Sequence, residues 1–174
     1  QIICQTCHMA HGGINNKFLV LPTDDPDRMT VLCEACHRID PGETAAQKSG
    51  KYSHPVDISL KGSAEIPERW SSGERIVLGP KGQLVCRTCH RTHGAKPGTK
   101  LLTTDNNADS MCIQCHRSQA LVLGTDHDLT ITAPEFKNSL DQTASRGGVC
   151  SPCHIVHNAL YSRFLWATPL GPVR

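Results

Sequence analysis

The motif C-x-x-C-H occurs five times in this chain and limits what the chain can fold into more than any other feature. The five copies use all ten cysteines, so none is left for another role. In chain order the cysteine pairs are Cys4 and Cys7, Cys33 and Cys36, Cys86 and Cys89, Cys112 and Cys115, and Cys150 and Cys153. The histidines that follow them are His8, His37, His90, His116 and His154. This spacing is typical of covalent c-type haem attachment.

Each residue of the motif has a chemical task in haem attachment. Two thiols three residues apart on a helical turn can each add to one vinyl group of a haem, and the next residue then presents its imidazole to the iron. A single C-x-x-C pair also fits a zinc site, a disulfide or a thioredoxin-like redox pair. A disulfide framework is the alternative that remains, and it leaves the five histidines unexplained. The sequence therefore predicts five covalently bound haem c groups with the motif histidines as proximal iron ligands.

The chain has ten histidines, and the five outside the motifs match in number the sixth iron positions of five haems. They are His11, His54, His93, His127 and His157. We interpret them as distal ligands, so that each iron is held by two imidazoles; the alternative is that they are ordinary surface residues. Methionine ligation would raise the haem potential, but Met9 and Met111 lie beside or inside motif turns and cannot reach across. The sequence therefore predicts low-potential haems.

Three motifs extend to C-x-x-C-H-x-x-H, with a second histidine three residues after the first. The pairs are His8 and His11, His90 and His93, and His154 and His157. On a helix, residues i and i+3 lie on the same face, so the two rings cannot bind opposite sides of one iron. If these segments are helical, the second histidine binds a different haem and holds two haems close together. The alternative is that it donates a hydrogen bond to a haem propionate.

The composition does not suit an ordinary apolar core. The chain has 174 residues, or about 35 for each predicted haem, which is too few to build a thick core. Aromatic residues make up 4%, whereas there are 14 glycines and 11 prolines. The predicted fold class is a mostly irregular chain with short α-helices and at most one small β-hairpin, a multihaem cytochrome c with haems as its core. Without haem the protein is expected to be unfolded.

The motifs recur in a repeating order, which predicts two full two-haem units and half of a third. The predicted domains are residues 1–62, a two-haem unit; 63–85, a connecting segment with a hairpin; 86–133, a second two-haem unit; and 134–174, a single-haem half-unit. A short apolar segment follows each extended motif, at residues 18–21, 101–102 and 164–166. We interpret these segments as haem-packing surfaces rather than strands.

Local signals predict two further elements. Residues 75–85 contain two β-rich runs around the turn-forming residues 79–82, which predicts the hairpin. Pro134 is expected to open a helix that runs to about Thr143, and the glycines at 147–148 end this segment before the fifth motif.

Helix starts and stops are also predicted around the motifs. The second motif of each unit is expected on a helix that begins at a polar residue, Asp25 or Asp27 in the first unit and Asn107 or Asp109 in the second. Residues suitable for a helix stop follow the extended motifs, at Gly12 and Gly13, Gly94 and Asn158.

The sequence also bears on the compartment and on the charge of the protein. No apolar run approaches the roughly 20 residues needed to span a bilayer, and no signal-peptide pattern precedes Cys4. We expect a mature chain whose signal peptide has been removed, in the periplasm or outside the cell, because families with this haem attachment complete it outside the cytoplasmic membrane. The formal charge is +2, but the propionates of five haems would make the loaded protein acidic. Lysine and arginine are scattered, which argues against nucleic-acid binding.

The incomplete third unit leaves a mismatch between ligands and irons. If each full unit supplied its own distal ligands, the fifth haem would lack a sixth ligand and His157 would lack an iron. Because His154 and His157 cannot serve the same iron, ligands must cross either between units or between chains. Crossing within the chain gives a compact monomer, whereas crossing between chains joins copies head to tail into an open assembly.

The pattern in residues 4–54 and 86–127, C-x-x-C-H-x-x-H-G followed by a second C-x-x-C-H and a distal histidine, resembles the doubled-CxxCH multihaem cytochromes. The C-x-x-C-H-x-x-H element is also similar to that of extracellular cytochrome filaments, the nanowires of metal-reducing and other anaerobic prokaryotes. This second resemblance implies haems stacked in a continuous line, with axial histidines that can be shared between subunits. The haem number matches the pentahaem donors of nitrite reductases, which do not share the three extended motifs.

The predicted function is electron transfer rather than catalysis, because iron with two imidazole ligands has no vacant position for a substrate. The expected partners are redox proteins or extracellular electron acceptors, and further copies of the chain if it polymerises. One alternative is a soluble periplasmic shuttle or a donor subunit for a reductase. A second is an enzyme in which one iron keeps an open site, with His127 as the histidine that is not a ligand.

Overall fold

The computed structural model describes residues 2–12, 15–21, 31–37, 52–56, 65–95, 98–161 and 163–168. Its α-helices are four residues long each: α1 (Cys4–Cys7), α2 (Val31–Glu34), α3 (Cys86–Cys89), α4 (Cys112–Cys115), α5 (Leu129–Thr132) and α6 (Ala144–Gly147). Its 3₁₀-helices are η1 (Asn16–Phe18), η3 (Asn107–Asp109), η4 (Arg117–Val122) and η5 (Arg163–Leu165). Within these ranges extended pairing is limited to isolated β-bridges. The prediction of a mostly irregular chain with short helices is confirmed.

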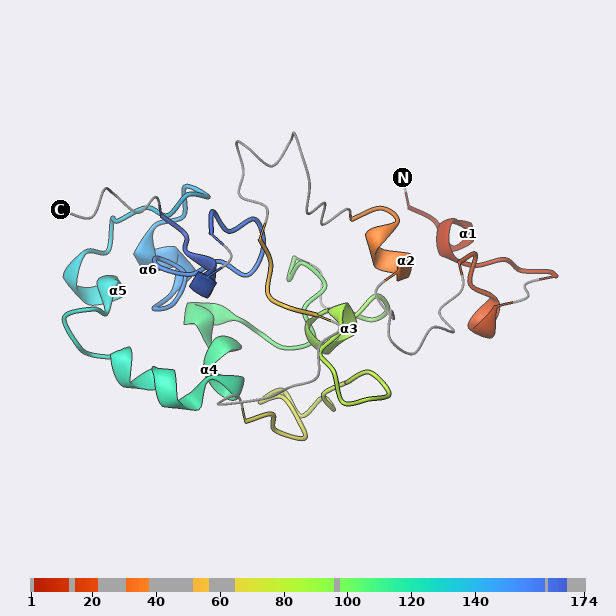
Figure 1. Ribbon diagram of the computed structural model, residues 1–174, viewed down its shortest axis with the longest axis horizontal. Helices are drawn as coiled ribbons and strands as arrows, with labels where there is room; N and C mark the ends of the chain where they lie inside the picture. The colour runs from red at the N-terminus through yellow and green to blue at the C-terminus, as the bar shows by residue number, and fades with distance from the viewer. Residues whose placement is uncertain are drawn as a thin grey trace.

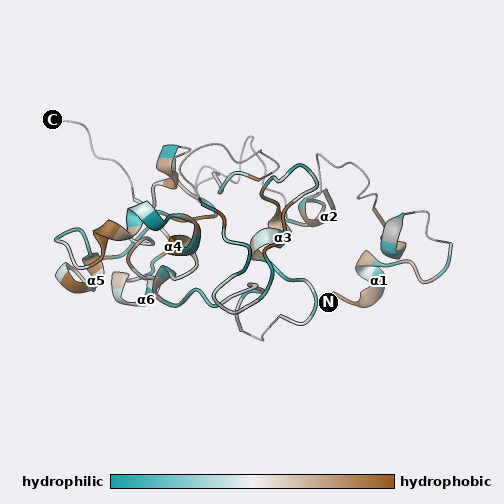
Figure 2. Ribbon diagram, turned by 90° about the horizontal axis from the view of Figure 1, so that it is seen from below, coloured by the Kyte–Doolittle hydropathy of each residue, from teal (hydrophilic) through white to brown (hydrophobic). Residues whose placement is uncertain are grey.

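Helices α1 to α5 follow one another along an elongated molecule, and α6 lies between α4 and α5. Figure 1 shows α1 near one end, α3 in the middle and α5 near the other end, with α2 and α4 between them. The view from below in Figure 2 keeps the same order. The helices of the first four motifs are therefore spread along the long axis in chain order, and the chain then turns back so that the fifth motif lies beside the fourth.

The short motif helices end because each motif histidine leaves the helical conformation. His8 has φ −121° and ψ 138°, and His90 has φ −113° and ψ 143°, both extended. In all five motifs the histidine N–H donates to the carbonyl of the first cysteine, over 2.8–2.9 Å, and this bond closes the turn. The helix therefore ends before the second histidine of each extended motif. The geometry that we considered for a continuous helix does not apply to these segments.

The predicted helix stops lie in turns that come after the helices have ended. Gly12 and Gly94 both have φ 69°, and Asn158 has φ 64°, which is the left-handed region that glycine and asparagine tolerate best. The three positions are equivalent, each four residues after the motif histidine. They turn the chain back towards the motif rather than cap a helix.

The hairpin predicted for residues 75–85 is wrong in form. The segment contains a tight turn, in which the Gly79 N–H donates to the Gln83 carbonyl over 2.9 Å, but no strand. The buried Gln83 side chain lies against Gly79, where an added Cβ would come within 2.5 Å of it. The antiparallel contact occurs earlier, as a bridge between Arg69 and Arg75. The first run also contacts the third motif, where the Thr88 hydroxyl donates to the Val77 carbonyl over 2.7 Å.

The helix predicted from Pro134 to about Thr143 is also absent. Lys137 forms an antiparallel bridge with Thr143, and the buried Asn138 holds the loop between them. Its side-chain oxygen accepts hydrogen bonds from the N–H groups of Leu140 (2.9 Å) and Gln142 (3.1 Å). An asparagine side chain that binds nearby backbone in this way competes with helix formation. The helix begins only at Ala144, as α6.

The apolar core of the described residues is small. Its cluster of buried residues consists of Ile155, Ala159 and Ala167, with Tyr52 and Leu165 packed against it. Residues 52–56 pair with residues 156–159 through an antiparallel bridge, so backbone contacts cross the predicted boundary between the first unit and the half-unit. In the described part of the chain no helix has the length and apolar character needed to cross a membrane.

Candidate haem sites

Neighbouring C-x-x-C-H motifs touch through their sulfur atoms. The thiol of Cys33 in the second motif is hydrogen-bonded to Cys86 in the third, and Cys112 in the fourth is hydrogen-bonded to Cys150 in the fifth. The third and fourth motifs are also neighbours, because the charge of Cys115 acts on Cys89. The thiols therefore join the second motif to the third and the fourth motif to the fifth, and the third and fourth motifs are close enough for their thiol charges to interact.

The pKa values of the free thiols follow from these contacts and from burial. The hydrogen bond from Cys86 lowers the pKa of Cys33 to about 7. Burial raises the pKa of Cys89 to about 11. The hydrogen bond with Cys150 raises the pKa of Cys112. None of the ten cysteines is paired in a disulfide, so each motif keeps both of its sulfur atoms for a haem.

Three pairs of histidine rings face each other across a nearly constant gap. The ring centroids of His8 and His93 are 5.9 Å apart and those of His90 and His157 are 6.1 Å apart, each pair with an interplanar angle of 29°. The rings of His54 and His116 are 6.1 Å apart at an angle of 62°. Each pair joins one motif histidine to one of the other five.

This gap fits a metal ion between the two rings. Metal–imidazole bonds are about 2 Å long, and a ring centroid lies about 1 Å behind the ligating nitrogen, so two imidazoles on opposite sides of one metal have centroids about 6 Å apart. Ordinary aromatic pairs have centroids about 4.5–7 Å apart, so the distance alone also suits rings packed on each other. The feature that points to a shared metal is that each of the three pairs joins one motif histidine to one histidine outside the motifs. The residues therefore fit an iron held from both sides by imidazole, in the first, third and fourth motifs.

The ring pairs cross between the predicted units. His93 comes from the third motif and faces His8 of the first, and His157 comes from the fifth motif and faces His90 of the third. The second histidine of an extended motif therefore reaches an earlier extended motif. In both pairs the two rings belong to the same chain, as they would if ligands crossed between units of one chain.

Four histidines remain outside these pairs. The rings of His11, His37 and His127 are exposed and face no other aromatic ring in the part of the chain that the structure describes. The ring of His154 stacks on Trp166, with centroids 5.1 Å apart and an angle of 19°. The structure therefore brings six of the ten predicted ligands together and leaves four without a facing imidazole among the described residues.

Two of the unpaired histidines nevertheless lie near the paired ones. Burial, followed by the charges of His54 and His154, lowers the pKa of His116. Burial, followed by the charges of His90, His54 and His37, lowers the pKa of His157. A lowered pKa keeps an imidazole neutral, which is the form that binds a metal.

The apolar segments after the extended motifs pair with the motif histidines. Antiparallel bridges join His8 to Leu19, His90 to Leu102 and His154 to Trp166. We call residues 15–20, 98–103 and 163–167 the first, second and third return loops. The sequence showed these segments only as apolar, and we interpreted them as haem-packing. Their similar distance from the motif histidine, 11 or 12 residues to the bridged residue, was the signal for a shared backbone contact.

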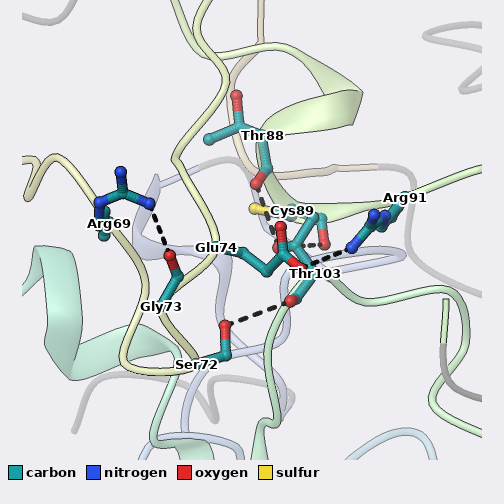
Figure 3. Close-up of polar contacts among 8 residues, drawn as sticks. All are labelled: Arg69, Ser72, Gly73, Glu74, Thr88, Cys89, Arg91 and Thr103. Carbon is teal, nitrogen blue, oxygen red and sulfur yellow. Dashed lines mark hydrogen bonds and ion pairs between the residues drawn. The ribbon is translucent and has the colours of Figure 1, made fainter. Parts of the chain in front are cut away.

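Polar contacts join the connecting segment, residues 63–85, to the third motif and to the second return loop. Figure 3 shows Thr103, in the second return loop, between Ser72 and the end of α3. Its hydroxyl donates to the Cys89 carbonyl over 3.2 Å, and its own carbonyl accepts from the Ser72 hydroxyl over 3.5 Å. Arg91 reaches Glu74 over 2.8 Å, an exposed ion pair that contributes little by itself.

Asp109 binds the fifth motif, not the start of the helix that carries the fourth. The helix α4 begins after Met111, and its N-cap makes no side-chain hydrogen bond. The Asp109 side chain is only 2% exposed and accepts hydrogen bonds from the N–H groups of Cys150 (2.8 Å) and Ser151 (2.7 Å) and from the Ser151 hydroxyl (2.7 Å). Gly148 permits this approach, because a Cβ there would lie 2.5 Å from the backbone of Ala108. The expectation that Asn107 or Asp109 starts the fourth-motif helix was therefore wrong, and the equivalent candidates of the first unit, Asp25 and Asp27, lie outside the described residues.

We expect Asp109→Ala to lower the free energy of unfolding of the haem-loaded protein by about 3 kcal/mol or more, because three donors around a buried carboxylate lose their acceptor. The measurement is chemical denaturation followed by the visible absorbance. Asp105→Ala is the matched control, since Asp105 is exposed and bonds only the neighbouring Asn107. A loss of the same size in both variants would contradict the role of Asp109.

Comparison with known proteins supports the interpretation of the motifs. Residues 2–41 and 80–121 match the family described as doubled CXXCH motif. The chain carries the doubled CXXCH motif twice. This match is consistent with a multihaem c-type cytochrome that binds haem c covalently and transfers electrons, and such cytochromes are typically extracytoplasmic. Neither the curated proteins nor the solved structures that were searched contain a match to the chain.

Proposed function

We propose that this protein is a pentahaem c-type cytochrome that carries electrons along a row of closely packed haems, each held by two histidines. The observation that carries the proposal is the repeated ring gap of 5.9–6.1 Å between a motif histidine and a second histidine. Haem with two imidazole ligands exchanges electrons without binding a substrate. The ten cysteines are the anchors, and all ten histidines are the axial ligands.

We assign three of the distal ligands on the basis of the ring pairs. His93 serves the haem of the first motif, His157 that of the third and His54 that of the fourth. His11 and His127 are then left for the haems of His37 and His154. The contacts between cysteines of successive motifs support a continuous row, since thioether-bound edges of adjacent haems would lie beside each other.

Intact mass spectrometry combined with electron paramagnetic resonance tests this proposal. We expect the purified protein to weigh five haems more than its polypeptide, because the chain has five attachment motifs. The oxidised protein should show only low-spin ferric iron. A substantial high-spin signal would mean that one iron keeps an open position, and would favour the alternative of a reductase with His127 as a histidine that binds no iron.

We propose further that the protein acts outside the cell and joins copies of itself head to tail. The argument is the direction of the ring pairs: the first extended motif is served from the third motif, and the third from the fifth. If the fifth motif follows the same rule, its His154 needs the second histidine of another extended motif as the distal ligand of its haem. His11 is such a histidine, and among the described residues it faces no ring. A soluble periplasmic shuttle, in which His11 or His127 of the same chain serves His154, is the alternative.

Negative-stain microscopy separates these two forms. We expect wild-type protein to form filaments at high concentration and the His11→Ala variant to remain as monomers, because only the link between copies is removed. The variant should also gain a high-spin signal from one haem. Dispersed wild-type monomers at every concentration would leave the shuttle as the better description.

A further inference from the structure

The three return loops share a contact that neither the motifs nor the ligand count explains. In each, a backbone carbonyl faces the Nδ1 atom of a motif histidine: Lys17 faces His8 and Lys100 faces His90, both over 3.1 Å, and Phe164 faces His154. A carbonyl oxygen can only accept a hydrogen bond, so the ring must donate its Nδ1 proton. The lone pair is then on Nε2, which is the atom left to bind an iron.

The carbonyl is presented by a strained backbone. The residue that carries it and the residue that follows are both left-handed in every loop: Lys17 and Phe18, Lys100 and Leu101, Phe164 and Leu165, with φ between 50° and 60°. None of the six is a glycine, and other residues rarely adopt this conformation. Strain of this kind is retained where the surrounding structure requires it, and it points to a role for the conformation.

Two backbone hydrogen bonds hold each strained pair in place. In the second return loop the Arg91 N–H donates to the Leu101 carbonyl over 2.6 Å, and the Thr103 N–H donates to the Cys89 carbonyl over 2.9 Å. The first and third loops repeat both bonds at the equivalent residues. The loop is therefore clamped to the motif on both sides of the carbonyl that faces the ring.

The fourth motif is built differently. After His116 the chain continues into η4 (Arg117–Val122) instead of returning, and the His116 ring makes no hydrogen bond within the residues described. Its neighbour Arg117 places a positive charge beside the site, paired only loosely with Glu65 over 3.8 Å.

We infer that the return loops are positioning devices that hold His8, His90 and His154 as strong electron donors and so lower the reduction potential of their haems relative to that of the fourth motif. A ring that donates its Nδ1 proton to a carbonyl becomes a more basic ligand, and a more basic ligand favours ferric iron. The row therefore contains a site of higher potential between the third and fifth motifs. This inference rests on the proposed haem ligation.

Substitution of Lys100 tests the inference at the third motif. Its side chain is exposed, so replacement leaves no cavity. Proline cannot adopt the φ of 53° found at Lys100, so Lys100→Pro moves the carbonyl away from His90. Lys100→Gly is the matched control, because glycine adopts this φ freely and loses the same charge. We expect a redox titration of the haem-loaded Lys100→Pro protein to show one midpoint potential raised, with the other potentials unchanged and with Lys100→Gly identical to wild type.

Nuclear magnetic resonance of the reduced wild-type protein gives an independent test that does not depend on the folding of a variant. The ring Nδ1 protons of His8, His90 and His154 should exchange slowly with solvent, and that of His116 should exchange fast. Unchanged potentials in a folded Lys100→Pro protein, or fast exchange at all four rings, would overturn the inference and leave the return loops as scaffolding. The haem number and the spin state of the same sample separate this inference from the proposed function. Five haems with only low-spin iron would support the proposed function even if the return loops did not affect the potentials.

Discussion

Polypeptide produced without haem attachment is expected to lack a cooperative unfolding transition. Eight buried hydrophobic residues are found in the described part of the chain, and three of them are alanines. Burial of so little apolar surface cannot offset the conformational entropy lost when well over a hundred residues are ordered. Thioether bonds and iron–histidine bonds must therefore supply much of the stability, as metals do in small metal-dependent domains.

Circular dichroism during heating, with the matured protein as control, measures this effect. We expect the haem-free chain to show the spectrum of a largely unfolded polypeptide, with no sharp melting temperature, and the matured chain to melt sharply at high temperature. A haem-free chain that melts cooperatively near the temperature of the matured one would show that the polypeptide folds around its own core.

Loss of the His157 ring should open one iron. The variant His157→Ala removes the imidazole whose centroid lies 6.1 Å from that of His90. We expect about one haem in the loaded protein to become high-spin, and the reduced protein to bind about one more carbon monoxide per chain than wild type, since a vacated sixth position accepts an exogenous ligand. Added imidazole should restore the low-spin spectrum.

Two further variants keep this test specific. Val156→Ala alters an exposed neighbour of His157 and should leave the spectrum unchanged. His157→Met should retain low-spin iron but raise one potential, because a thioether ligand favours ferrous iron. An entirely low-spin His157→Ala protein would mean that His90 has a different partner, and the assignment of the ring pairs would have to be abandoned.

The features that local chemistry specifies were readable from the sequence. The turn of C-x-x-C-H is closed by a hydrogen bond from the histidine to the first cysteine, four residues earlier, so it forms the same way in all five copies. The left-handed turn positions were visible as Gly12, Gly94 and Asn158, because few other residues accept that backbone. The spare histidines could be counted, and their number predicted two imidazoles for each iron.

The assignment of partners depended on the arrangement of the chain in three dimensions. His8 and His93 face each other across 85 positions of sequence, and Asp109 reaches Cys150 across 41, distances over which no local periodicity operates. The predicted hairpin and the helix after Pro134 failed because the Gln83 and Asn138 side chains bind the backbone of their own loops, and Asn138 also binds the Ser151 carbonyl of the fifth motif. Motif chemistry thus fixes which groups are present, while long-range packing selects which histidine faces which, because facing rings must be brought together by contacts far apart in the chain.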